Sequence, residues 1–150
     1  MMVSDEIDER ILQALSEAGR MPNTELADRV GLSPSACLRR VQALERTGII
    51  RGYRAVLDTV QLGRGFIAYI TVGLNDHTTG SQEAFEQAIS KAPEVVECHN
   101  ITGSVEYLLR VEVADLAAYK TFHAETLGTL PQVNSLTTFV VMASPKDLRA

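Results

Sequence analysis

The run Gly31-Leu32-Ser33-Pro34 separates two short stretches of helical hydrophobic periodicity, and it constrains the fold more than any other feature of the chain. Gly31 permits a sharp turn. Ser33 followed by Pro34 is a typical helix start. The serine side chain can cap the helix, and the backbone N–H that proline lacks would have no intrahelical partner at the first helical position. The run therefore predicts two helices joined by a tight turn, the helix-turn-helix motif.

The first third of the chain predicts three helices, each with a capping residue at its start and apolar residues at helical spacing. Their expected bounds are Ser4 or Asp5 to Gly19, Asn23 or Thr24 to Val30, and Pro34 to Thr47. Gly48 suits a left-handed C-terminal cap, and Ala27 supplies the small residue needed where two helices cross. These offsets favour a helix-turn-helix domain. The alternative is an ordinary three-helix bundle with a polar outer face.

The predicted third helix has two different faces. At about 100° per residue, Cys37, Val41 and Leu44 share one narrow face, which we expect to pack against the second helix. The opposite face is polar and suited to hydrogen bonding with base edges or phosphates, which predicts a recognition helix. The predicted DNA-binding residues are Ser33, Ser35, Arg39, Arg40, Gln42 and Arg46. Arg40 lies on the flank, where it reaches either a phosphate or a partner within the protein.

The formal net charge of -5 is unevenly distributed along the chain. Residues 1–64 contain nine basic and nine acidic residues, whereas the remainder contains five and ten. From Arg29 to Arg54, six arginines accompany a single acid, Glu45. Attraction to phosphates depends on such local charge rather than on the charge of the whole chain. The distribution permits DNA binding, although the arginines also fit a simply solvated helix face.

The second half of the chain changes to strand periodicity. Strands are expected at residues 66–74, 95–101, 105–113 and 133–142, with helices starting after Ser81 and Asp115 and the second ending near Glu125. The order β-α-β-β-α-β is typical of a ferredoxin-like fold. The predicted fold class is α+β: an N-terminal three-helix helix-turn-helix (winged-helix-like) domain at 1–51, a strand and linker at 52–65, and a C-terminal ferredoxin-like βαββαβ sandwich at 66–150.

The strands of the predicted sandwich are apolar on much of both faces, while two helices can cover only one face. A largely exposed apolar sheet face predicts an interface. Two copies packed through it would present two recognition helices to a two-fold symmetric operator. The alternative is a small monomeric domain.

Characteristic motifs extend along nearly the whole chain, among them DERILQAL at 8–15, VGLSP at 30–34 and CLRRVQALE at 37–45. Further matches lie at 19–20, 25–27, 48–50, 52–53, 55, 62–63, 101–103, 107–111 and 130–131. In these motifs the sequence resembles the Lrp/AsnC, or feast-famine, family of transcriptional regulators. The resemblance implies sequence-specific binding of double-stranded DNA and dimers formed through the C-terminal sheets, with assembly into tetramers or octamers. It also implies an amino-acid effector bound by the C-terminal effector-binding and oligomerisation domain, with no other cofactor.

The turn between the second and third strands of the sandwich is the expected effector site. Gly103 lets a ligand approach the backbone, and the Glu106 carboxylate suits an ammonium group. The expected effector-binding residues are Thr102, Gly103, Ser104, Glu106, Tyr107 and His99. By resemblance alone, the same interface is bordered by Thr137, Thr138 and Phe139. The family usually carries aspartate at the position of Glu106 and often an acid at that of Ser104, which leaves the effector's identity open. The alternative is a plain hairpin turn with a surface glutamate.

Signals for an enzyme are weak in this sequence. The three histidines lack metal-ligand spacing and no serine or cysteine shows a nucleophile signature, so we expect no catalytic residue and no metal. No stretch suffices for a membrane span, and Cys37 and Cys98 are expected to be free thiols of a cytoplasmic protein.

Two alternative functions stay open. One is a decarboxylase of siroheme-type tetrapyrroles with the same two-domain plan, which would need basic residues and histidines where this half of the chain is acidic. The other is a nucleoid-organising protein of weak sequence preference.

Overall fold

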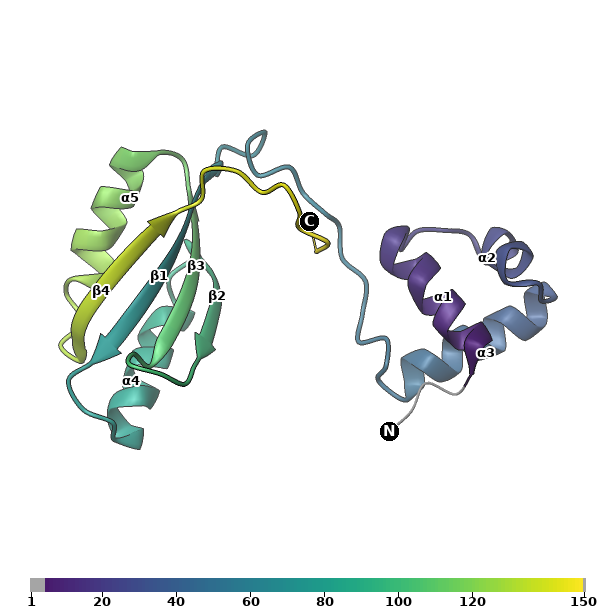
Figure 1. Ribbon diagram of the computed structural model, residues 1–150, viewed down its shortest axis with the longest axis horizontal. Helices are drawn as coiled ribbons and strands as arrows, with labels where there is room; N and C mark the ends of the chain where they lie inside the picture. Colours follow the sequence, from purple (N-terminus) through teal and green to yellow (C-terminus); the bar gives the residue numbers. More distant parts are fainter. Residues whose placement is uncertain (1–4, 150) are drawn as a thin grey trace. The chain divides into compact units, whose positions relative to one another are not determined.

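The computed structural model describes residues 5–149, and the chain divides into two compact units, Met1–Ala55 and Val56–Ala150 (Figure 1). The first unit contains the helices α1 (Glu6–Glu17), α2 (Asn23–Val30) and α3 (Pro34–Arg46). Gly31 has a φ of 75° and Gly48 a φ of 82°, the left-handed conformation that the turn and the end of α3 require. The predicted helix-turn-helix domain is confirmed.

Side-chain caps fix the starts of α1 and α3. The Asp5 carboxylate accepts a hydrogen bond from the backbone N–H of Asp8 at 2.9 Å. The Ser33 hydroxyl accepts one from the backbone N–H of Ala36 at 3.2 Å, and Pro34 occupies the first turn of α3. Each cap satisfies one of the backbone N–H groups that a helix start leaves without an intrahelical partner.

The start of α2 differs from the prediction. Neither Asn23 nor Thr24 caps this helix, because it already begins at Asn23. The Asn23 side-chain amide instead donates to the backbone carbonyl of Pro34 at 2.8 Å, which ties the start of α2 to the start of α3. The core that the three helices enclose consists of Ile11, Ala14, Leu26, Ala27, Val30, Cys37 and Leu44.

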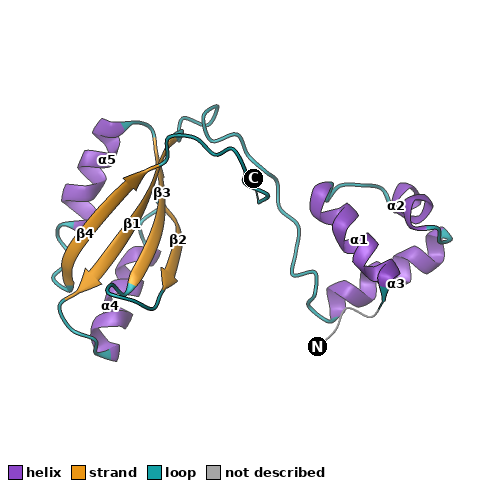
Figure 2. Cartoon of the chain, in the orientation of Figure 1, coloured by secondary structure: helices purple, strands orange, loops and turns teal. Residues whose placement is uncertain are grey.

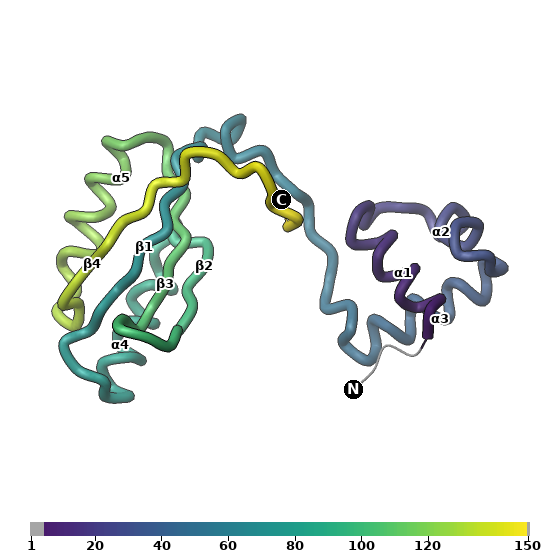
Figure 3. Tube along the Cα trace, viewed as in Figure 1, coloured from purple at the N-terminus to yellow at the C-terminus, as the bar shows by residue number. Residues whose placement is uncertain are grey.

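The second unit is an antiparallel four-stranded sheet with two helices, in the predicted order β-α-β-β-α-β (Figure 2). Its elements are β1 (Phe66–Leu74), α4 (Thr79–Ser90), β2 (Val95–Asn100), β3 (Tyr107–Val113), α5 (Leu116–Phe122) and β4 (Val133–Val140). The strand order is β2-β3-β1-β4, so β1 and β3 are central and β2 and β4 form the edges (Figure 3). The ferredoxin-like prediction is confirmed.

Both helices of this unit cover the same face of the sheet. Phe85 and Ile89 of α4, and Tyr119 and Phe122 of α5, belong to one core cluster with alternate residues of β1 and β3. The other face of the sheet carries the intervening residues and has no helix of the unit against it. Among the residues that the structure describes, this face is therefore open.

Several predicted boundaries in this unit are wrong by a few residues. α4 is capped by Thr78 rather than Ser81, because the Asp76 carboxylate accepts from the Thr78 N–H at 2.9 Å and holds the threonine at the helix start. α5 ends at Phe122 and continues as a π-helical turn, His123–Leu127, instead of remaining α-helical to Glu125.

The strand expected within the segment at 52–65 is not formed. These residues have no strand partner in the part of the chain that the structure describes, and a strand exists only through hydrogen bonds to a neighbour. Their apolar side chains remain exposed, with exposed fractions of 50% for Tyr53, 65% for Val56 and 57% for Leu57.

Candidate DNA-binding and effector sites

The outward face of α3 presents the polar side chains that the sequence placed there. Ser35, Arg39, Gln42 and Arg46 are all exposed. Cys37 and Leu44, on the opposite face, are buried in the core of the domain. Within residues 5–149, neither Arg39 nor Arg46 has a carboxylate at ion-pair distance. Their guanidinium groups are therefore available for phosphates or base edges.

Ser33 has a structural task at the start of the same helix. Its hydroxyl accepts the capping hydrogen bond of α3 and lies 3.3 Å from the Ser35 hydroxyl. Ser33 thus positions the helix whose outward face carries four of the other predicted DNA-binding residues, Ser35, Arg39, Gln42 and Arg46.

Arg40 is tied to carboxylates of α1 and its cap. Its Nη1 lies 2.7 Å from Asp5 Oδ2 and 3.2 Å from Asp8 Oδ1. The hydrogen bond from Arg40 holds the pKa of Asp5 below its usual range, and the two carboxylates raise the pKa of Arg40. The sequence allowed Arg40 to contact either a phosphate or a partner within the protein. The structure shows two partners within the protein, so Arg40 joins α3 to α1 and its cap.

Arg10 is a second basic side chain that braces this domain, and no sequence pattern indicated this role. Its Nη2 donates to the backbone carbonyl of Arg29 at 2.9 Å, near the C-terminal end of α2. A cation at this end stabilises the helix by binding a free carbonyl and by complementing the helix dipole.

The expected effector turn connects β2 to β3 and is fixed by backbone hydrogen bonds. The Ile101 N–H donates to the Glu106 carbonyl at 2.9 Å, and the Glu106 N–H donates to the Val72 carbonyl of β1 at 3.0 Å. Gly103 has a φ of 119°, which only glycine adopts readily. Thr102, Gly103 and Ser104 are exposed at the tip of the turn.

Glu106 is not the free carboxylate that the sequence suggested. The residue is buried, and its Oε2 accepts from the Leu74 N–H at 2.7 Å. Its Oε1 lies 2.8 Å from Nδ1 of His77, whose side chain is 84% exposed. Glu106 therefore joins the effector turn to the end of β1 and to the loop before α4. A ligand's ammonium group would have to share or displace the His77 contact.

Tyr107 must be removed from the expected effector contacts. Strand alternation places it on the helix-covered face, where its ring packs against Phe85 with centroids 4.7 Å apart. Its hydroxyl donates to the Glu86 carboxylate. Burial raises the pKa of Tyr107 most, and the Glu86 carboxylate raises it further. The side chain belongs to the core of the domain.

The open face of the sheet is more polar than expected. A single row crosses all four strands: Glu97 is opposite Arg110, Arg110 is opposite Tyr69, and Tyr69 is opposite Phe139. Arg110 donates to the Tyr69 hydroxyl at 2.7 Å and to Glu112 at 3.2 Å. The part of this row on β2 and β3 is charged. The prediction of a largely apolar face is therefore wrong for these two strands.

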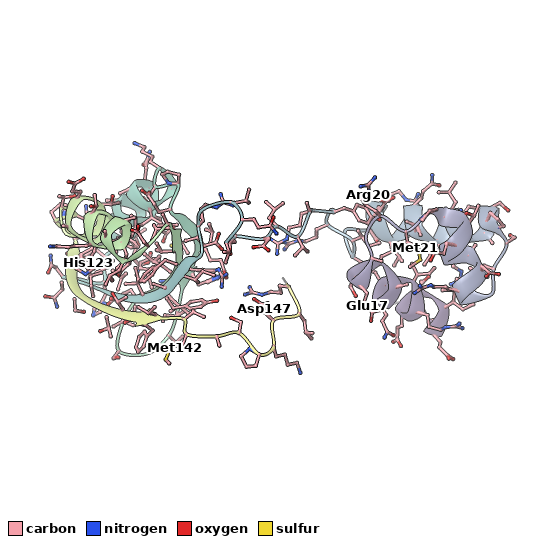
Figure 4. All side chains as sticks on the ribbon, turned by 90° about the horizontal axis from the view of Figure 1, so that it is seen from above. Glu17, Arg20, Met21, His123, Met142 and Asp147 are labelled. Carbon is pink, nitrogen blue, oxygen red and sulfur yellow. The ribbon has the colours of Figure 1, made fainter. Side chains whose placement is uncertain are left out.

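Two further groups flank this row. His99 Nε2 lies 2.9 Å from Glu97 Oε1, so His99 belongs to the charged part of the open face and not to the tip of the effector turn. Arg149 lies 3.4 Å from the same carboxylate and 3.8 Å from Asp147. Asp147 and Met142 are seen in the segment that follows β4 (Figure 4).

The described part of the chain contains no group of three or more His, Cys, Asp or Glu residues that could hold a metal ion. None of the helices formed by residues 5–149 has the length and apolar character that crossing a bilayer requires.

Comparison with known proteins bears on both units. Residues 4–51 match the model of a winged helix-turn-helix DNA-binding domain, and residues 67–150 match that of the Lrp/AsnC ligand binding domain. A helix-turn-helix joined to a ligand-binding βαββαβ domain defines a DNA-binding transcriptional regulator. The chain belongs to the Lrp/AsnC family of these regulators.

Individual relatives are similar over almost the full chain. The leucine-responsive regulatory protein of Escherichia coli (strain K12) is 43% identical over 95% of this chain and 87% of the relative. A transcriptional regulator from Neisseria meningitidis, solved in complex with L-Met, has a TM-score of 0.91 at 38% identity and covers 95% of this chain and 92% of its own. AsnC of E. coli has a TM-score of 0.87 at 26% identity, with 97% of each chain covered.

Proposed function

We propose that this chain regulates transcription in the cytoplasm by placing α3 in the major groove of double-stranded DNA. The observation that carries the proposal is the division of α3 into two faces. Cys37 and Leu44 are buried in the core, while Arg39, Gln42 and Arg46 point away from it and are exposed. A helix held by one face and polar on the other can enter the groove without disturbing its own domain.

Replacement of Arg39 tests this placement. Arg39→Ala removes an exposed guanidinium that is free of ion pairs among the described residues, and loss of a bidentate base contact costs about 1–3 kcal/mol. Binding to a duplex that the wild-type protein enriches from genomic fragments is expected to weaken by roughly 5- to 150-fold. Arg20→Ala is the matched control, because it removes the same charge from an exposed position after α1 (Figure 4). Equal losses for both variants would reject the recognition-helix assignment.

The C-terminal domain is proposed to sense an amino acid at the 101–106 turn. The support is the exposed tip with Gly103 at a φ of 119°, together with two similar structures described as L-methionine complexes, one of them a feast or famine regulatory protein from M. tuberculosis. The test is calorimetry with a panel of free amino acids that includes L-methionine and L-leucine. Gly103→Thr is expected to abolish the binding heat, while Gly80→Ala in α4 leaves it unchanged. Absence of binding by every amino acid, or identical heats for both variants, would contradict the site.

Self-association is proposed through the open face of the sheet. Phe139 is 56% exposed on β4, next to Tyr69 in the cross-strand row. A second copy would cover both and give the two-fold symmetry that pairs two recognition helices. Phe139→Asp is expected to shift the protein toward monomer in sedimentation, and Leu116→Asp, at a 65% exposed position on α5, serves as the control. An unchanged sedimentation coefficient for Phe139→Asp would refute this interface.

A further inference from the structure

Leu38 is the exception in the packing of the three helices of the first domain. It lies on α3 with 45% of its surface exposed. Every other large apolar side chain between Asp5 and Gly52 belongs to the core cluster or packs against it, and the half-exposed Tyr53 lies beyond the helices. Core packing therefore gives no reason for a leucine at this position.

The position of Leu38 on the helix gives it different neighbours. Residues three and four apart lie next to each other on a helix surface, so Leu38 borders Ser35 on one side and Gln42 on the other. Both belong to the exposed polar face of α3. If that face enters the major groove, Leu38 enters with it, and this inference rests in that respect on the proposed function.

The floor of the major groove offers one apolar group, the C5 methyl of thymine. Hydrogen-bonding groups on the other bases gain nothing from a leucine and would lose water beside it. We propose that Leu38 contacts a thymine methyl and specifies a T·A pair at one position of each half-site. Ser35, Gln42 and the arginines then supply hydrogen bonds and charge around a single apolar contact.

Two variants separate this role from folding. Leu38→Ala removes the contact and keeps a strong helix former, and because Leu38 lies outside the core cluster we expect the domain to fold normally. Leu38→Met keeps an apolar side chain of similar reach, so it is expected to retain the thymine preference. Circular dichroism confirms folding of each variant before binding is measured.

The experiment is selection from a random-sequence duplex library by the full-length wild-type protein and by both variants. Wild type and Leu38→Met are expected to enrich a T at a position where Leu38→Ala enriches none, with the other positions unchanged. The enriched duplex is then made with deoxyuridine in place of that thymidine, which deletes only the methyl group. Wild type is expected to bind the uridine duplex about fourfold more weakly, the factor that burial of one methyl group gives, and Leu38→Ala is expected to bind both duplexes equally.

The possible failures are distinguishable. If wild type enriches no sequence at all, both the proposed function and this inference are overturned. If wild type enriches a sequence and Leu38→Ala enriches the same one, or if the uridine substitution costs both proteins the same affinity, the proposed function survives and the role of Leu38 is rejected.

Discussion

The cap of the recognition helix offers a sharp test of how the DNA-binding domain is built. The Ser33 hydroxyl accepts the hydrogen bond from the backbone N–H of Ala36 at 3.2 Å. Ser33→Ala leaves that N–H without an intrahelical partner, and loss of such a cap costs about 1 kcal/mol. Ser33→Asp keeps the acceptor and adds a negative charge at the helix start, where the helix dipole favours it. We therefore expect Ser33→Ala to destabilise the domain and Ser33→Asp to retain its stability.

The size of the domain makes a loss of this size measurable. At roughly 0.05–0.15 kcal/mol per residue, a unit as small as Met1–Ala55 is stable by only about 3–8 kcal/mol. A loss of about 1 kcal/mol is thus a substantial share of the domain's free energy of unfolding. It lowers the protection of core amides against hydrogen exchange about fivefold. The amides of β3, in the other unit, provide an internal reference in the same sample.

Hydrogen exchange of the full chain is the assay. For Ser33→Ala the protection of amides in α1 and α3 is expected to fall about fivefold while that of β3 amides is unchanged. Ser35→Ala is the matched control, because the Ser35 hydroxyl contacts Ser33 but does not accept the capping hydrogen bond, so its loss should lower protection much less. Unaltered protection in Ser33→Ala, or an equal loss in Ser33→Asp, would refute the capping argument.

Three further predictions concern buried and paired groups. Because Arg40 lowers the pKa of Asp5, the contribution of their pair is complete above the ordinary aspartate pKa of about 3.9 and is lost as pH falls below it. In urea titrations, the free energy of unfolding of the wild type should fall at acid pH, and that of Arg40→Ala should fall less. Equal decreases would contradict the pairing. Glu106→Ala should cost the second domain about 1–3 kcal/mol in urea unfolding and Glu106→Gln less, because glutamine keeps an acceptor for the buried N–H; a larger loss for glutamine would contradict the assigned bond. Phe85→Ala, at 0% exposure, should cost about 3–5 kcal/mol, whereas Phe139→Ala, at 56%, should cost at most about 0.5 kcal/mol in the monomer, and similar values for both would contradict the core assignment.

Local sequence signals predicted most of the fold. Ser33, Pro34 and Gly31 act within one turn of the chain, so their chemistry specifies a helix start and a left-handed turn without tertiary information. Alternate residues of β3, among them Leu109 and Val111, are apolar in the sequence, and the structure buries these residues. Boundaries were less well determined where two residues compete for one role, as Thr78 and Ser81 do for the cap of α4.

The parts of the sites that could not be predicted depend on contacts between distant segments. A helical projection places Arg40 on the flank of α3, but it does not reveal that Asp5, 35 positions away, lies beside it. Glu106 similarly follows an exposed turn in sequence, and only the sheet register brings its carboxylate to Leu74, 32 positions away. The sequence predicted which elements carry the proposed sites, whereas the internal partners of these two charged residues required the structure.

We propose that α3 binds specific DNA through its outward face and that an amino acid acting on the second domain controls this binding. A genome-wide footprint of the wild-type protein and of Arg39→Ala, recorded with and without added amino acids, tests both parts together. We expect discrete wild-type sites with a shared two-fold pattern, loss of these sites in Arg39→Ala, and a change in wild-type occupancy with at least one amino acid. Footprints that are identical for the two proteins, or wild-type occupancy that no amino acid alters, would contradict this proposal.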